Sequence, residues 1–376
     1  MPSLYVHLPF CPYICPYCDF AKWPHKRSAA DEYLRALLSE ITRAQPGGGE
    51  WNTAYLGGGT PNTYGASEIG AVLDLLRERF PGPPNRETTI ELNPELVRGE
   101  DVLAYREAGI NRVSIGVQSF VESEARTLGR KHTIEDVAAA VASARAAGIR
   151  SVNVDLMFAV PGQTPESWSR SVDAAIALGV DHVSAYGLTV EAGTPYETWR
   201  EREPQAFADD ALEAELYAIV IDKLESAGFE QYEISNFARP GHASAHNANY
   251  WANGEYAGFG TGAASYLGGV RSVNTRDLRA YVNAALSGAP IPKDSERLDG
   301  MQKAGEAVML ALRTAQGVPL RIFKERYGFD FMEQYGPVVE RYEELGLLEV
   351  GTAYARLTRR GRFLANEVCA AFVTFA

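Results

Sequence analysis

Residues 5–18 read YVHLPFCPYICPYC and carry three of the four cysteines of the 376-residue chain. Cys11, Cys15 and Cys18 directly follow a β-rich run, and a proline stands after each of the first two. A 4Fe-4S cluster is usually held by four cysteine thiolates. Three thiolates would hold three irons and leave the fourth iron open to another ligand. The loop therefore predicts a 4Fe-4S cluster with one exchangeable coordination site.

A structural zinc site and a thiol redox switch are the alternatives that this spacing leaves open. Structural zinc takes four ligands in a tetrahedron, so His7, His25 or Cys369 would have to supply the fourth. A redox switch needs a cysteine of lowered pKa, which a sequence does not reveal. Cys369 itself is better explained as core packing, because it stands beside apolar positions that recur at helical spacing.

Outward from the cysteine loop, short β-rich runs alternate with Ala-, Leu- and Glu-rich stretches at a spacing of roughly thirty residues. This cadence predicts an α/β fold, a partial parallel (β/α)6 barrel. Glycine- or proline-containing turns at residues 57–61, 93–94 and 161–162 fall just after expected strands, where such barrels build their sites. The expected strands cover residues 4–10, 53–58, 87–93, 112–118, 151–159 and 182–189.

The second half of the chain has a different pattern. A helix is expected over residues 205–227, whereas residues 231–269 are rich in glycine and aromatic side chains without a clean period. We expect a barrel over residues 1–240, an irregular connection over 241–295, and a smaller, mainly helical, winged-helix-like C-terminal domain over 296–376. In that domain the expected helices are 298–314, 331–345 and one from 361 onward, and the expected strands are 347–350 and 354–357.

The composition narrows the class of protein. The hydrophobic fraction of 46% is that of a globular protein, and the formal net charge of −12 gives no basic surface for a nucleic acid backbone. No apolar run approaches the roughly 20 residues that cross a bilayer, and the N-terminus does not read as a secretion signal. With only four cysteines, metal chemistry is favoured over a disulfide scaffold. We therefore expect a cytoplasmic protein without membrane insertion.

The cysteine loop and the segment GGGTP at residues 57–61 together resemble the cluster and glycine motifs of the radical S-adenosylmethionine (SAM) family. The resemblance implies that SAM chelates the open iron through its amino and carboxylate groups, while bare glycine backbone approaches its methionine part. It also implies that Tyr5, Gly59 and Glu91 contact this SAM, with the Glu91 carboxylate accepting hydrogen bonds from the ribose. Matching positions bind a second SAM in one branch of the family; here they are Thr60, Gln118, Arg130 and Asp155.

Nearly the whole chain resembles the branch that contains the oxygen-independent coproporphyrinogen III oxidases and the related heme chaperones. The oxidases have a further cysteine two residues after the third, where this chain has Phe20. They also have an N-terminal extension, whereas only ten residues precede Cys11 here. Both departures favour the heme chaperones.

Residues 246–251 read HNANYW and resemble the HNxxYW signature of the heme chaperones. Histidine is the commonest protein ligand of heme iron, and aromatic side chains can cover a porphyrin. The resemblance implies a heme site with His246 as axial ligand and Tyr250 and Trp251 beside the ring; His242 lies close enough to replace His246. Read without the resemblance, a His-Asn pair commonly caps backbone groups and a Tyr-Trp pair anchors a core.

The expected function is that of a heme chaperone, which binds a 4Fe-4S cluster, SAM and heme and delivers heme to apo-proteins such as respiratory enzymes at the membrane. The alternative is an oxygen-independent coproporphyrinogen III oxidase or another porphyrin-directed radical SAM enzyme, so enzymatic activity is left open and no catalytic residue is assigned. A radical enzyme acting on RNA is disfavoured by the acidic balance. A zinc-stabilised binding protein is a further alternative, and a homodimer is compatible with the sequence.

Overall fold

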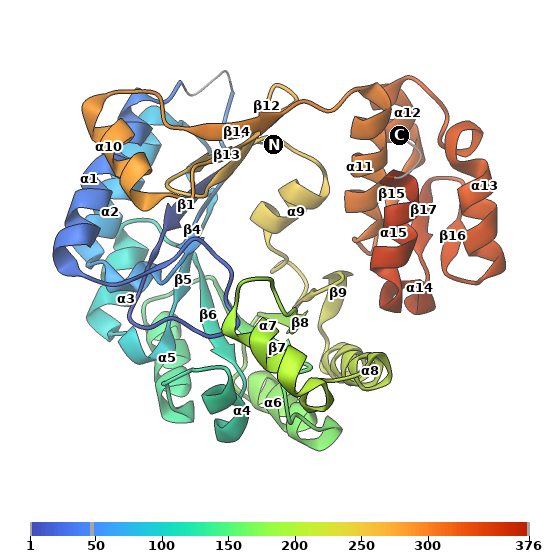
Figure 1. Ribbon diagram of the computed structural model, residues 1–376, viewed down its shortest axis with the longest axis horizontal. Coiled ribbons are helices and arrows are strands. Elements are labelled where there is room, and N and C mark those ends of the chain that lie inside the picture. Colours follow the sequence, from blue (N-terminus) through green and yellow to red (C-terminus); the bar gives the residue numbers. More distant parts are fainter. Residues whose placement is uncertain (1, 46–48, 374–376) are drawn as a thin grey trace.

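The computed structural model describes residues 2–45 and 49–373. A long curved sheet has helices on its outer side, and a smaller C-terminal unit lies beside it (Figure 1). Two separate hydrophobic cores correspond to these two parts, one within residues 4–285 and one within residues 304–372.

Six parallel strands form the centre of the sheet, in the spatial order in which they occur in the chain. This confirms the partial parallel barrel, and the observed bounds differ from the expected ones by at most two residues. The strands are β1 Ser3–Leu8, β4 Thr53–Gly58, β5 Glu87–Leu92, β6 Arg112–Gln118, β7 Ser151–Phe158 and β8 His182–Gly187.

The two faces of this sheet differ in polarity. Apolar side chains such as Leu56, Ile90 and Ile115 are completely buried in the core shared with the outer helices. Because alternate residues of a strand point to opposite faces, the residues between them point into the barrel, and most of these are polar. On four neighbouring strands the inward-pointing residues Glu91, Ser114, Asn153 and His182 lie side by side. The barrel interior is therefore a polar surface suited to binding.

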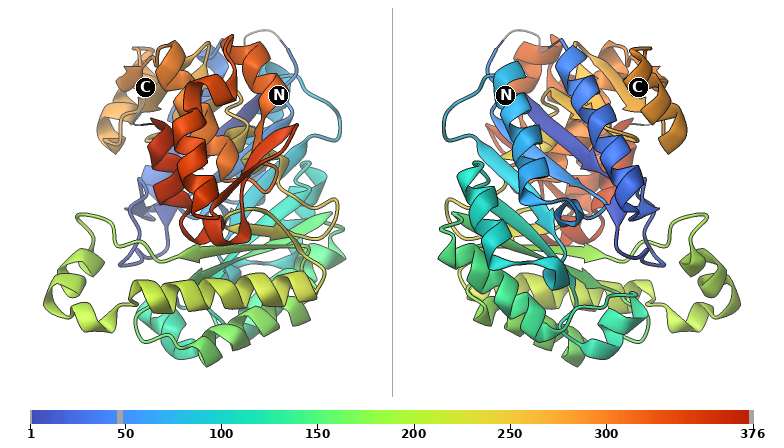
Figure 2. Two further views of the ribbon diagram at one scale, coloured as in Figure 1. Left: turned by 90° about the vertical axis from the view of Figure 1, so that its right-hand side faces the viewer. Right: turned by 90° about the vertical axis from the view of Figure 1, so that its left-hand side faces the viewer.

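The helices that cover the outer face follow the strands in the expected alternation (Figure 1). Several begin at a side-chain cap; at α5, for example, Thr133 accepts a hydrogen bond from the Asp136 N–H. A segment containing α7 projects sideways from the barrel beside the long helix α8 (Figure 2). The bounds are α1 Arg27–Arg43, α2 Ala66–Arg79, α3 Gly99–Glu107, α4 Glu122–Thr127, α5 Ile134–Ala146, α6 Pro165–Ala177, α7 Pro195–Arg202 and α8 Asp210–Ser226.

The expectation of an irregular connection over residues 241–295 is wrong, because this segment forms helices and strands and completes the sheet. β11 pairs in parallel with β1, and β12, β13 and β14 continue antiparallel to the sheet edge; β9 and β10 extend the opposite edge. Strands of three to five residues, of which β14 is exposed throughout, are too short to show a two-residue period. The elements are β9 Glu230–Glu233, β10 Asn236–Ala238, α9 Ala245–Trp251, β11 Tyr256–Phe259, β12 Ala264–Leu267, β13 Val270–Asn274, α10 Leu278–Ser287 and β14 Lys293–Glu296.

The C-terminal domain is mainly helical, as expected, with a three-stranded sheet. One helix and one strand were not foreseen, α12 and the two-residue β15. Cys369 is 2% exposed in the core of this domain, as its helical spacing indicated. The last three residues of the expected final helix lie outside the described residues. The elements are α11 Gly300–Leu312, β15 Val318–Pro319, α12 Leu320–Tyr327, α13 Phe331–Glu344, β16 Leu348–Val350, β17 Tyr354–Leu357, α14 Arg359–Phe363 and α15 Ala365–Val373.

Polar contacts join the two domains. Arg359 forms an ion pair with Asp222 of α8, and Arg362 donates a 2.7 Å hydrogen bond to the side-chain oxygen Oε1 of Gln231. Arg359 and Arg362 therefore help to dock the C-terminal domain on the barrel. Within the described part of the chain, no helix combines the length and apolar character needed to cross a membrane.

Candidate functional site

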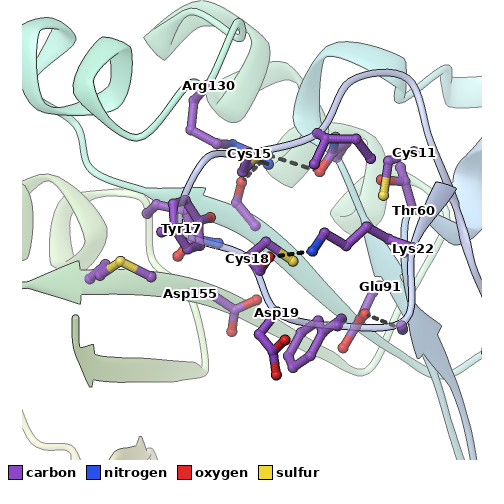
Figure 3. A pocket seen from close by; sticks show the side chains of 18 of the residues that line it. Cys11, Cys15, Tyr17, Cys18, Asp19, Lys22, Thr60, Glu91, Arg130 and Asp155 are labelled. Carbon is purple, nitrogen blue, oxygen red and sulfur yellow. Dashed lines mark hydrogen bonds between the residues drawn. The ribbon is translucent and has the colours of Figure 1, made fainter. Parts of the chain in front are cut away.

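A pocket of about 490 Å³ opens at the carboxyl ends of the parallel strands (Figure 3). It brings together most of the site residues that the sequence predicts. Apolar side chains share its lining; one of them, Phe20, is 66% exposed. The predicted residues in its lining are Cys11, Cys15, Cys18, Gly59, Thr60, Glu91, Gln118, Arg130 and Asp155.

The cysteine loop is closed on itself by main-chain contacts. Its two ends form a short parallel pair, β2 Phe10–Cys11 with β3 Trp23–Pro24, and the Cys18 N–H donates to the Cys15 carbonyl at 3.2 Å. Burial raises the pKa of the Cys11 thiol to about 11 and raises that of Cys18. Among the described residues, no three His, Cys, Asp or Glu side chains are close enough to hold a metal ion as they stand. The three sulfurs thus share one pocket, and their donor chemistry fits an iron–sulfur cluster.

The candidates for a fourth zinc ligand are placed differently. The ring nitrogens of His7 lie 3.0 Å from the Tyr5 hydroxyl and 2.7 Å from the Ala21 carbonyl oxygen. Cys369 belongs to the core of the other domain. His25 keeps a buried Nε2 that has no hydrogen-bond partner among the described residues, but it does not line the pocket. None of these three candidates therefore lines the pocket that holds the cysteines.

Arg130 brings a half-buried positive charge to the cysteine loop (Figure 3). Its guanidinium donates to Asn93 Oδ1 at 2.8 Å and to the Gly116 carbonyl at 2.7 Å, and it lies 3.9 Å from Cys15 Sγ. Two strand ends thus fix the cation in place. A fixed cation beside the cysteine loop favours the negative charge of a bound cluster.

Glu91 is held at the end of β5 by two donors. The Tyr55 hydroxyl donates to Oε1 at 2.8 Å, and the Gly58 N–H donates to Oε2 at 3.0 Å. Burial raises the pKa of Glu91 to about 7, and the nearby Asp155 adds to this rise. The carboxylate is thus oriented by the neighbouring strand β4, and its pKa lies near neutral pH.

The three glycines at residues 57–59 are required by the protein's own packing. A Cβ on Gly57 would lie 2.8 Å from Glu91 Cδ, and one on Gly59 would lie 2.5 Å from the Pro9 carbonyl carbon. Gly58 has a φ of 109°, which side chains rarely adopt, and a Cβ there would overlap His7. The motif is therefore more than a turn: it lets the cysteine loop, β4 and Glu91 meet at close range.

Asp155 and Gln118 lie at the far side of the pocket. Asp155 accepts hydrogen bonds from Asn153 Nδ2 at 2.7 Å and from Ser114 Oγ at 3.1 and 3.2 Å, and burial raises its pKa. Gln118 has a φ of 68°, a conformation that costs a non-glycine residue about 1 kcal/mol or more. Such strain at the rim of a pocket is typical of a functional site.

The residues expected to hold heme lie outside the cysteine pocket. His246, Tyr250 and Trp251 lie on α9, which packs against β4 of the barrel and α11 of the C-terminal domain; Figure 1 shows it between the parallel strands and that domain. His246 is 1% exposed, and neither it nor its two partners line the pocket. His242 precedes this helix and has a buried Nδ1 without a hydrogen-bond partner in the described part of the chain.

The sequence did not single out three residues that organise this site. Tyr55 holds Glu91, and Tyr13 binds Glu95. Lys22 donates to the Cys18 carbonyl (Figure 3). The inward alternation of β4 could have indicated Tyr55, since it stands two residues before Gly57. For Tyr13 and Lys22 we find no sequence signal, because their roles depend on how the loop closes.

Comparisons with known proteins agree with this fold and site. The pattern described as the Radical SAM superfamily matches residues 5–175, and that of the HemN C-terminal domain matches residues 298–364. The solved coproporphyrinogen III oxidase HemN of Escherichia coli, described as a radical SAM enzyme, has a TM-score of 0.86 and 25% identity, covering 100% of this chain and 91% of that one. The fold and the cysteine pocket thus define a radical SAM protein.

Full-length relatives narrow the class further. The heme chaperone HemW of Bacillus subtilis is 37% identical, with 99% of both chains covered. The heme chaperone HemW of Mycobacterium tuberculosis is 38% identical over 97% of this chain and 93% of its own length. This chain therefore belongs to the HemW family.

Proposed function

We propose that this protein is a heme chaperone that binds a 4Fe-4S cluster, SAM and heme and passes heme to apo-proteins. The observation that carries the proposal is the full-length similarity to proteins named heme chaperone HemW. The position of Phe20 supports it, because an exposed phenylalanine lines the pocket where the oxidases have a further cysteine.

The cofactor assignments follow from the donor chemistry of the pocket. Cys11, Cys15 and Cys18 would hold the cluster, and Arg130 would balance its negative charge. Glu91 would accept hydrogen bonds from the SAM ribose, with Gly59 in the same wall of the pocket and Tyr5 just beneath. Bound together, a reduced cluster and SAM supply one-electron chemistry; in a chaperone they can instead serve as a structural or regulatory input. Thr60, Gln118 and Asp155, together with Arg130, are the residues that would contact a second SAM.

Heme would be bound through the segment containing α9. We retain His246 as the axial ligand, with Tyr250 and Trp251 beside the porphyrin. The conformation described above has this imidazole inside the barrel, so heme ligation requires the side chain or the helix to move. His242, whose Nδ1 has no hydrogen-bond partner among the described residues, is the competing ligand.

A second candidate function is oxidative decarboxylation of the propionates of coproporphyrinogen III. It is favoured by the likeness to E. coli HemN over the whole of this chain. In this reading the cluster pocket would receive a porphyrinogen, and the segment containing α9 would have only a structural role.

One experiment separates the two functions. The full chain is reconstituted anaerobically with iron and sulfide, and heme titration and coproporphyrinogen III turnover are measured on the same preparation. The chaperone proposal expects about four irons per chain, stoichiometric heme binding, transfer to an apo-protein and no protoporphyrinogen IX. Turnover to protoporphyrinogen IX would establish the oxidase instead. A Cys15→Ala variant should lose the iron, whereas a zinc protein would contain none.

A further inference from the structure

Both ring nitrogens of His246 are engaged inside the barrel. Nδ1 lies 2.8 Å from Thr53 Oγ1 of β4, and Nε2 lies 2.9 Å from the Tyr250 hydroxyl one turn further along α9. A neutral imidazole has one lone pair available for a metal, and here a hydroxyl occupies it whichever tautomer is present. Heme ligation by His246 must therefore break at least one of these two hydrogen bonds.

The same imidazole supports the floor of the SAM pocket. Its ring faces the ring of Tyr55, with 5.0 Å between the centroids and 30° between the planes. Tyr55 in turn donates its hydroxyl to Glu91. A Cβ on Gly57 would lie 2.8 Å from both Tyr55 Cε1 and Glu91 Cδ, so the packing there leaves little free space. A continuous path of contacts thus joins α9 to the carboxylate that faces SAM.

The two ends of α9 are also held. Glu87 accepts hydrogen bonds from the Ala245 and His246 N–H groups at 3.1 and 2.9 Å at the start of the helix. After its end, Arg326 of the C-terminal domain donates to the Asn253 carbonyl at 2.8 Å. Arg313 of the same domain lies over the Trp251 ring at 5.5 Å. Movement of His246 out of the barrel would therefore disturb contacts at the pocket and at the domain interface.

We propose that SAM and heme each weaken the binding of the other to this protein, because the imidazole that would ligate heme is the one that supports Tyr55 beneath Glu91. The inference rests on the proposed function, in which Glu91 serves SAM and His246 serves heme. SAM orders Glu91 and Tyr55 and so holds the imidazole inside. Heme draws the imidazole out and leaves Glu91 less well positioned. Linkage requires each ligand to weaken the other by the same factor.

The first test measures that factor in both directions. Heme is titrated by absorbance into the reconstituted full chain with and without saturating SAM, and SAM is titrated by calorimetry with and without heme. We expect each dissociation constant to rise by the same factor, about 5-fold to 150-fold. In Tyr55→Phe the ring remains but the link to Glu91 is lost, so heme should still bind while the factor falls towards one.

The second test changes the hydrogen bonds that retain the imidazole. Thr53→Val removes the partner of Nδ1 and leaves a buried nitrogen unpaired, so the inside position becomes less favourable and heme affinity should rise, by roughly threefold to tenfold. Thr89→Val is the matched control. Thr89 lies beside Tyr55 on the adjacent strand and is fully buried, but its hydroxyl has no hydrogen-bond partner among the described residues. Heme affinity should be unchanged in this variant.

The outcomes distinguish a failure of this inference from a failure of the proposed chaperone function. Heme binding that is indifferent to SAM and to Thr53→Val would overturn the inference and leave the chaperone proposal standing. Heme binding that is lost in His242→Ala but kept in His246→Ala would also overturn it, because no hydrogen bond or ring contact joins His242 to Tyr55 in the described part of the chain. A wild-type chain that binds no heme would overturn both.

Discussion

The hydroxyl of Tyr13 donates a 2.7 Å hydrogen bond to Glu95 Oε1 and thereby ties the cysteine loop to the turn that follows β5. The Lys131 N–H donates to the same hydroxyl at 3.3 Å, and its ammonium lies 4.8 Å from the centre of the Tyr13 ring. Three segments distant in sequence are thus joined at one side chain between the first two cysteines. The loop's shape therefore depends on residues outside the cysteine motif itself.

The first prediction concerns this anchor. Tyr13→Phe removes a hydrogen bond to a carboxylate, which is worth about 1.5–3 kcal/mol. We expect the reconstituted variant to lose iron to a chelator several-fold faster than the wild type, and Glu95→Gln to act on the same bond without adding to the effect. Tyr354→Phe, which removes an exposed tyrosine hydroxyl in the C-terminal domain, is the control. Equal iron loss in all three variants would contradict the anchoring role.

The second prediction is a pH dependence of SAM binding. Burial places the pKa of Glu91 near 7, so lowering the pH through 7 protonates it and removes the charged acceptor. The dissociation constant for SAM should therefore rise as the pH falls from about 8 to 6, and Glu91→Gln should bind SAM at least tenfold more weakly at pH 8. Equilibrium dialysis with labelled SAM measures both.

Asp155 also faces this pocket with a raised pKa, so it needs its own variant. Asp155→Asn should keep the pH dependence that Glu91→Gln loses. A profile that stays steep in Glu91→Gln and becomes flat in Asp155→Asn would assign the dependence to the other carboxylate.

The third prediction tests the glycine motif as a packing device. Gly59→Ala places a methyl group 2.5 Å from the Pro9 carbonyl carbon, and main-chain atoms cannot yield as a flexible side chain can. We expect a loss of about 1–3 kcal/mol in the free energy of unfolding and poor cluster incorporation. Gly70→Ala in α2, with nothing within 4 Å of its added methyl, should instead be neutral or stabilise by up to about 1 kcal/mol. Denaturant unfolding compares the two.

The parallel part of the fold could be predicted because its strands are buried and evenly spaced. β4 and β6 match the expected residues 53–58 and 112–118 at both ends. The strands β11 to β14 could not, since each spans only four or five residues and β14 is fully exposed. Their membership of the sheet is a tertiary property: β11 is a strand because β1 lies beside it.

The candidate site was predictable where a motif carries chemistry. The cysteines and Glu91 share a pocket because residues after parallel strands meet at one edge. The burial of His246 was not predictable, because its sequence neighbours are equally compatible with an exposed loop. Only the placement of α9 against β4 brings Thr53 and Tyr55 around its ring.

The position of β1 constrains how the protein is made. β1 lies between β4 and β11, and Ser3 pairs with Thr53 on one side and Tyr256 on the other. During translation β4 can pair with one edge of β1 early. The other edge stays unpaired until β11 is made, when about two-thirds of the chain has left the ribosome. The cysteines follow this strand directly, so they emerge first but gain their complete surroundings late. A cell making this protein must therefore keep three thiols reduced and free of stray metal throughout most of its synthesis.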